Sequence, residues 1–126
     1  MAAVGDMSDA RDAAVREALS DLEAALPGAS AALVLRSGAL FGGRAPSAVN
    51  REVYAAMVAA MAGAAEAATA DLGAEVQWVE ARLKQGALVT APIGKKLVLV
   101  VHVAEDAGPS VSTKLLDAAK RLAVLF

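Results

Sequence analysis

The chain has 126 residues, the length of a single domain, and 57% of them are hydrophobic, which is ample for one core. Its net charge of −2 argues against a nucleic-acid-binding protein, because such a protein needs a basic surface to neutralise phosphates. The absence of cysteine excludes disulfides, thiolate zinc sites and cysteine nucleophiles, and it suits the cytoplasm, where we place the protein.

The N-terminal stretch predicts neither a signal peptide nor a membrane anchor. Asp6, Asp9 and Asp12 interrupt any apolar run, and no basic segment precedes one. The longest uncharged stretch of helical character, residues 53–65, is shorter than the roughly 20 apolar residues that cross a bilayer. We therefore expect no membrane span, a loose leader over residues 1–7, and a single domain over residues 8–126.

The first predicted element is a helix that begins near Ser8. Serine is a good N-cap, and the carboxylates of Asp9 and Asp12 favour the positive end of a helix dipole. Pro27 and Gly28 end the helix. Its apolar positions recur at helical spacing: Val15, Leu19, Leu22 and Leu26.

A β-hairpin is predicted next. Residues 31–35 form an apolar run of strand length, and Ser37 and Gly38 supply the turn. Residues 39–41 return as the second strand, which Gly42 and Gly43 end or bulge.

The second helix, at about residues 50–72, carries apolar residues on more than one face. A surface helix normally has one apolar stripe and one charged face, but no charge lies between Glu52 and Glu66. One stripe consists of Val53, Met57, Ala60, Ala64 and Ala68. The other consists of Tyr54, Val58, Met61, Ala65 and Leu72.

A helix that is apolar almost all round has to be covered on more than one side. One stripe can cover the domain's own sheet, and a domain this small has little left to cover the other, so we infer a partner there. Gly63 and its neighbouring alanines would let another helix approach closely. The alternative is that alanine only fills the helix and is indifferent to exposure.

Three further strands are predicted. Residues 76–83 read as a strand whose apolar alternation slips, which a bulge or burial of both faces would explain. Residues 87–91 form the next strand, and Pro92, which cannot donate a ladder hydrogen bond, is expected at a bulge or a non-pairing position. The continuous apolar run of residues 97–103 predicts a central strand.

The chain ends in an amphipathic helix that Ser110 or Ser112 is expected to cap. The order is then α-β-β-α-β-β-β-α, and the short hairpin turns predict an antiparallel sheet with helices packed on it, an α/β (α+β) domain. The apolar face of the last helix consists of Leu115, Leu116, Ala119, Leu122, Ala123 and Phe126.

Nothing in the sequence assembles a catalytic or metal site. His102 is the single histidine, and without cysteine or a second histidine it reads as an ordinary sheet residue. We therefore expect no catalytic residue, no metal and no cofactor, and a protein that is not an enzyme. Asp9 and Asp12 are interpreted as partners of the helix dipole, Glu105 and Asp106 as a solvated turn, and Lys95 and Lys96 as a hairpin tip. Gly42 and Gly43 lack the spacing of a phosphate-binding loop.

The element order and four landmarks together resemble the roadblock/dynein light chain family, over about residues 8–126. They are the hairpin at residues 31–40, the long small-residue helix with Met57, Met61 and Gly63, the segment 88–94 followed by the strand 97–103, and the Leu-rich last helix. The resemblance implies a profilin-like roadblock fold, a five-stranded antiparallel sheet between helices. The Arg36-Ser37-Gly38 turn departs from the longer or more acidic turn common in the family.

The resemblance also implies a homodimer, in which the third strand pairs with its copy and the second helix packs beside that seam. This would explain both the helix with too many apolar faces and the strand with slipped alternation. The expected interface residues are Tyr54, Met57, Val58, Met61, Ala64, Ala65, Val76, Trp78, Glu80 and Arg82. The sequence allows Trp78 to lie either at this interface or in the ordinary core.

Family members serve as platforms for Ras-like small GTPases, as their GTPase-activating partners, and as dynein light chains. This chain resembles the prokaryotic stand-alone members, which implies a homodimeric, non-enzymatic scaffold or regulator of a Ras-like small GTPase, with a GTPase-activating or platform role. The alternatives are an assembly module that ignores nucleotide and a small-molecule sensor with an internal cavity.

If the partner is a GTPase, we expect positioning of its switch loops rather than donation of an arginine. Nothing in the sequence distinguishes one of the seven arginines that we expect on the surface. They are Arg11, Arg16, Arg36, Arg44, Arg51, Arg82 and Arg121.

Overall fold

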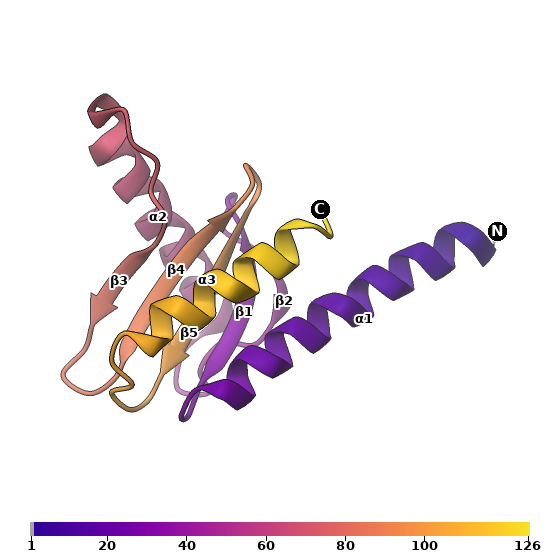
Figure 1. Ribbon diagram of the computed structural model, residues 1–126, viewed down its shortest axis with the longest axis horizontal. Coiled ribbons are helices and arrows are strands. Elements are labelled where there is room, and N and C mark those ends of the chain that lie inside the picture. Colours follow the sequence, from indigo (N-terminus) through magenta and orange to yellow (C-terminus); the bar gives the residue numbers. More distant parts are fainter. Residues whose placement is uncertain (1) are drawn as a thin grey trace.

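The computed structural model describes the backbone of residues 2–126 and the side chains of residues 9–126. It contains three long helices and five strands in the predicted order (Figure 1). The elements are α1 (Ala2–Ala25), β1 (Ser30–Leu35), β2 (Leu40–Gly43), α2 (Arg51–Thr69), the short 3-10 helix η1 (Ala70–Leu72), β3 (Val79–Arg82), β4 (Ala87–Ile93), β5 (Leu97–Val103) and α3 (Ser110–Ala123).

The five strands form one antiparallel sheet in the order β2-β1-β5-β4-β3. The predicted central strand, β5, pairs with β1 on one side and β4 on the other, and its register runs from Leu97 opposite Leu35 to His102 opposite Ser30. Its continuous apolar run follows from this place, because a central strand with helices on both faces exposes neither side.

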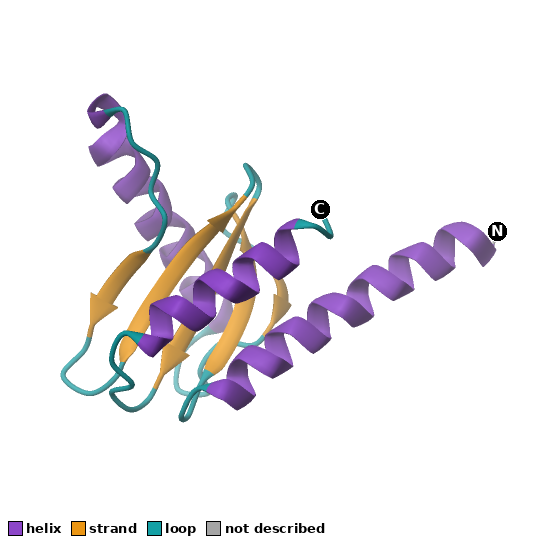
Figure 2. Cartoon of the chain, in the orientation of Figure 1, coloured by secondary structure: helices purple, strands orange, loops and turns teal. Residues whose placement is uncertain are grey.

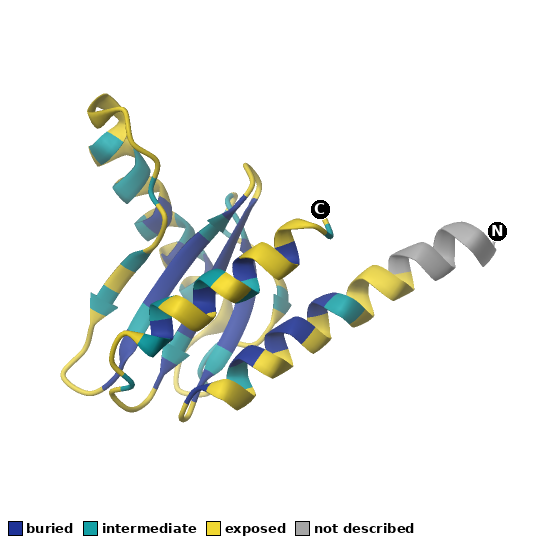
Figure 3. Cartoon of the chain, viewed as in Figure 1, coloured by how far each residue is buried: buried dark blue, intermediate teal, exposed yellow. Residues whose placement is uncertain are grey.

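Helices cover both faces of the sheet, so the domain has three layers (Figure 2). Helices α1 and α3 lie side by side on one face, where they enclose the larger core with residues such as Leu33, Leu99 and Leu115. Helix α2 lies on the opposite face over β1 and β5. The strands β1, β5 and β4 are largely buried on both sides, whereas the C-terminal part of α2 extends past the sheet into solvent (Figure 3).

The smaller core fixes the orientation of α2. Ala55, Val58 and Ala62 lie on one side of the helix and pack on the apolar side chains of β1 and β5. Asn50 caps the first turn, since its Oδ1 accepts a hydrogen bond from the backbone N–H of Val53 at 3.0 Å.

Helix α2 with η1 is also long and apolar enough, by length and composition alone, to cross a membrane.

Two expected helix starts are wrong. Helix α1 begins at Ala2 rather than near Ser8, because the residues before Ser8 include good helix formers and no proline. The division into a leader and a domain stays a prediction. Neither Ser110 nor Ser112 caps α3, because Pro109 holds the N-cap position and both serine hydroxyls donate to carbonyl oxygens.

The third strand is shorter than predicted. It begins at Val79, so Val76 and Trp78 precede it and the slipped alternation reflects irregular backbone rather than a bulge. Continuing the β3–β4 register would put Gln77 opposite Pro92, which has no N–H to donate to a ladder. Pro92 itself lies inside β4, in register with Val98, and not at a bulge.

Candidate protein-binding surface

The outer side of α2 is an exposed apolar stripe. Val53 and Met57 are 58% and 61% exposed, and the small residues that continue their spacing are exposed as well. When large apolar side chains that are exposed to solvent lie next to one another, they mark an interaction surface. We call this set the α2 stripe: Val53, Met57, Ala60, Ala64 and Ala68.

Most of the other predicted stripe faces the sheet of its own subunit, but Leu72, at the end of η1, is exposed. Tyr54, Met61 and Ala65 are half-buried, and Val58 is only 2% exposed within the smaller core. In this subunit Val58 has almost no surface to offer a second copy, because its side chain already packs on its own sheet. Of the expected helix positions, Met57 and Ala64 point outward.

The edge of the sheet at β3 is open. This strand is four residues long and pairs only with β4, so its outer backbone groups have no strand partner among the described residues. Such an edge can pair with another strand. Trp78, directly before it, is 41% exposed, so the structure places this ring at the surface of the subunit rather than in its core.

The side chains of β3 are divided between the two faces of the sheet. Val79 lies opposite Thr90 and Ala81 opposite Leu88, so this pair shares the face of α2. Glu80 and Arg82 point to the other face, where they form an ion pair at 3.1 Å. The expected interface residues thus do not form one patch, and only the open backbone edge connects the two sides.

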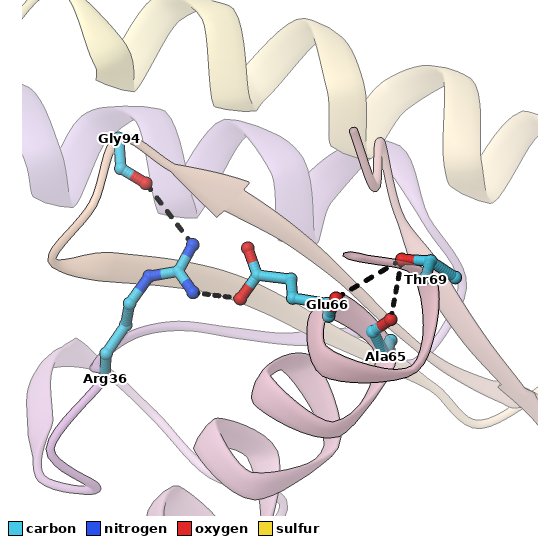
Figure 4. A network of polar contacts seen from close by, with 5 residues as sticks. All are labelled: Arg36, Ala65, Glu66, Thr69 and Gly94. Atoms are coloured by element: carbon cyan, nitrogen blue, oxygen red, sulfur yellow. Dashed lines mark hydrogen bonds and ion pairs between the residues drawn. The ribbon is translucent and has the colours of Figure 1, made fainter. Parts of the chain in front are cut away.

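One ion pair connects the C-terminal part of α2 to the turns at the end of the sheet (Figure 4). The guanidinium of Arg36, after β1, pairs with the carboxylate of Glu66 on α2, and its Nη2 donates to the carbonyl oxygen of Gly94 at 3.3 Å. The backbone N–H of Arg36 also donates to the carbonyl oxygen of Lys96 at 2.9 Å. Helix α2 is thereby joined to two hairpin turns.

Sequence reasoning missed this contact, and one signal could have found it. Glu66 interrupts a long apolar run, and a lone charge beside a core needs a partner. A surface hollow of about 500 Å³ adjoins the pair, with Arg36, Glu66, Thr69 and Glu75 among its lining residues. Because both signs of charge line this hollow, it selects neither an anion nor a cation.

Apart from Arg51, the remaining arginines lie on other elements than α2. Arg44 pairs with Glu23, Arg121 with Glu17 and Asp21, and Arg11 lies over the ring of Phe126. Arg51 begins α2 and is exposed, as is Arg16 on α1. None of the contacts between described residues marks one of these arginines as a catalytic donor.

The other sequence candidates lie apart from one another. His102 is half-buried opposite Leu88, and Asp106 accepts a hydrogen bond from the backbone N–H of Gly86 at 3.0 Å. Gly43 has a φ of +84° and lies against the backbone of β1, where a β-carbon would not fit. Among the residues whose side chains are described, no group of three or more His, Cys, Asp or Glu could hold a metal ion.

Comparison with solved structures identifies the fold. The gliding protein MglB of Thermus thermophilus superposes with a TM-score of 0.82 at 24% identity, over 92% of this chain and 90% of that chain. An MglB described with a tetrameric arrangement gives the same values. Profilin II of Acanthamoeba castellanii gives a TM-score of 0.51 at 19% identity, over 75% and 84% of the two chains. The expected profilin-like roadblock fold is confirmed.

Comparison with protein families gives the same assignment from sequence. No curated protein matches the chain. The family model of the Roadblock/LC7 domain matches residues 16–102, which is more than half of the sequence and includes β1, α2 and all but the last residue of β5. The family resemblance seen in the sequence is therefore confirmed, and the chain belongs to the Roadblock/LC7 family.

Proposed function

We propose that this protein is a homodimeric, non-enzymatic regulator of a Ras-like small GTPase. The observation that carries the proposal is the α2 stripe, which leaves Val53 and Met57 exposed to solvent. Membership of the Roadblock/LC7 family supports the same function, because members of this family serve as platforms for such GTPases.

In the proposed dimer, β3 pairs with β3 of a second copy, and the two α2 helices pack beside that seam. Pairing would satisfy the open backbone groups of Val79–Arg82, and helix packing would remove the α2 stripe from water. The likeness to an MglB with a tetrameric arrangement is consistent with self-association. Isologous pairing of this kind is the commonest symmetry of soluble homo-oligomers.

The action on a GTPase is proposed to be geometric. A rigid pair of helices can hold the switch loops of the GTPase in the arrangement that hydrolysis needs. Arg51 is the exposed arginine closest in sequence to the α2 stripe, so Arg51→Ala separates positioning from donation of an arginine. Positioning predicts that stimulated hydrolysis falls by less than about tenfold, whereas loss of an arginine finger lowers the rate by about 10³-fold or more.

The dimer is tested by light-scattering mass of the wild type and of Met57→Glu. Met57 is exposed in the subunit, so the new charge costs the monomer little, but it would be buried at the seam and should abolish association. Ala24→Glu adds the same charge at an exposed position on α1 and should remain dimeric. A Met57→Glu protein that keeps the wild-type mass would exclude the α2 stripe from the interface.

The partner is tested with a small GTPase from the same genome, loaded with GDP or a GTP analogue. Binding of one nucleotide form alone supports a regulator, and hydrolysis is then measured with and without the protein. Equal binding of both forms would instead favour an assembly module that ignores nucleotide, which is the alternative function. A dimer that binds neither form would reject the GTPase and leave the dimer standing.

A further inference from the structure

We propose that a groove on the α1 and α3 side of the sheet binds an acidic, amphipathic peptide segment of a partner protein. The groove has a volume of about 520 Å³, within the range of protein ligand sites. It lies on the opposite face of the sheet from α2, so the inference does not rest on the proposed function. A partner held there would leave the α2 stripe accessible.

The floor of the groove is apolar and rigid. Leu35, Leu97 and Ile93 lie in register on the neighbouring strands β1, β5 and β4, and their side chains point to the face of α1 and α3. Ile93 and Leu97 are buried at the end of the larger core, so the floor is held by the fold and does not have to form when a ligand arrives.

Two aromatic rings form one wall. Phe41 of β2 and Phe126 after α3 meet edge to face with ring centroids 5.5 Å apart, and both stay partly exposed, at 39% and 47%. The β1–β2 pairing shifts register between Leu33 and Val34, which leaves Phe41 as an extra residue on β2. Rings that are rigid and partly exposed supply contact area at low entropic cost.

The polar side chains that line the described part of the groove are all cationic. Arg11 of α1 lies 5.1 Å from the centroid of the Phe126 ring, and Lys95 and Lys96 lie at the β4–β5 turn. Among the residues whose side chains are described, no acidic one lines the groove, and these three cations form no ion pair with a described carboxylate. In a protein with a net charge of −2, this groove is a local concentration of unneutralised positive charge.

The chemistry of the groove selects one class of ligand. Its floor and wall suit the apolar face of a short helix, which anchors through residues spaced i, i+3, i+4 and i+7. The cations come from two separate elements, so they match several carboxylates spread along a peptide better than a single headgroup. The apolar surface is concave, whereas attachment to a membrane surface needs apolar groups that protrude into the bilayer.

The test uses a labelled synthetic helical peptide with leucine at positions i, i+3, i+4 and i+7 and glutamate at the others. We expect saturable binding by fluorescence anisotropy, with amide shift changes at Gly94, Leu97 and Ala123 in NMR spectra of the full chain. Raising the salt concentration should weaken binding, because the rim charges are exposed to solvent. A matched peptide with lysine in place of glutamate should not bind.

Charge reversal at the rim supplies the decisive variant. Lys95→Glu with Lys96→Glu should weaken binding at least about tenfold. Lys84→Glu with Lys114→Glu makes the same change in net charge at exposed positions outside the groove and should bind as the wild type does. All four sites are exposed, so the variants should fold.

Three results would overturn the proposal. They are no binding at about 1 mM peptide, equal binding of the lysine peptide, or shift changes that avoid the groove. Binding to phosphatidylglycerol vesicles without binding to the glutamate peptide would also reject it, in favour of a membrane surface.

Discussion

The carboxylate of Glu66 on α2 pairs with the guanidinium of Arg36, the residue that follows β1. The two side chains are 38% and 26% exposed, so solvent screens the pair only in part. It joins the C-terminal part of α2 to the turns that follow β1 and β4, and beyond Ala62 no residue of this helix is fully buried.

The first prediction is that this pair stabilises the fold. Arg36→Ala and Glu66→Ala should each lower the free energy of unfolding by about 1 kcal/mol, more than a fully exposed pair would. The double variant should lose less than the sum, with a coupling of about 0.5 kcal/mol or more. Urea denaturation measures all four proteins, and Arg16→Ala, at an exposed position, is the matched control. Strict additivity would mean that the pair contributes nothing.

The second prediction concerns Tyr54, the single tyrosine. Burial raises the pKa of its hydroxyl from 10.0 to about 12, and the hydroxyl has no hydrogen-bond partner among the described residues. Tyr54→Phe should therefore leave stability at neutral pH unchanged or raise it by up to about 1 kcal/mol. A loss of more than about 1 kcal/mol would show that the hydroxyl is bonded.

The same shift fixes a pH dependence. Below pH 10 the phenol is neutral in both the folded and the unfolded state, so it adds no pH dependence to stability. Between pH 10 and about 12 the unfolded chain loses a proton that the folded chain keeps. Stability should therefore fall over this window more steeply in the wild type than in Tyr54→Phe. Ultraviolet absorbance of the phenolate reports the titration directly, and a midpoint near 10 would contradict the burial.

The third prediction uses Trp78, the single tryptophan, as a reporter of the proposed seam. Its exposed ring lies directly before the open edge of β3. Emission should shift to shorter wavelength as the concentration rises through the dimer range, because pairing of β3 removes water from the ring. The shift should be absent in Met57→Glu. Emission that stays constant while the light-scattering mass doubles would place Trp78 outside the interface.

The fourth prediction concerns two glycines in hairpin turns. Gly86 has a φ of +86°, and a β-carbon there would lie 2.0 Å from the carbonyl oxygen of Val103. Gly94 has a φ of +60° and open space around it. Gly94→Ala should cost about 1 kcal/mol for its backbone conformation, whereas Gly86→Ala should cost at least about 2 kcal/mol. Equal losses in thermal or urea denaturation would show that the end of β5 at Val103 shifts easily.

The sequence was sufficient for the order of elements and for the place of β5. Six of the seven residues of β5 are apolar and have to be covered on both faces, and the short turn before it implies antiparallel pairing with β4. The two stripes of α2 could likewise be separated by spacing alone. The family resemblance rested on these features and is confirmed.

Register and edges depend on contacts between segments far apart in the chain, so local patterns could not predict them. The strand β3 begins only at Val79, after the position whose partner would be Pro92, and predicting that start requires the pairing of β3 with β4 to be known. The same register sends Glu80 and Arg82 to the face away from α2, which divides the expected interface.

Local pattern determined which residues of this protein are apolar and at what spacing, because periodicity is a property of neighbours in the chain. Tertiary structure alone decided which stripe of α2 meets the sheet and which pairs of distant charges meet. Val58 is buried and Met57 exposed because α2 lies over β1 and β5, although the two are adjacent and both apolar. The groove beside Phe126 exists only because three strand ends, α1 and the β4–β5 turn converge there.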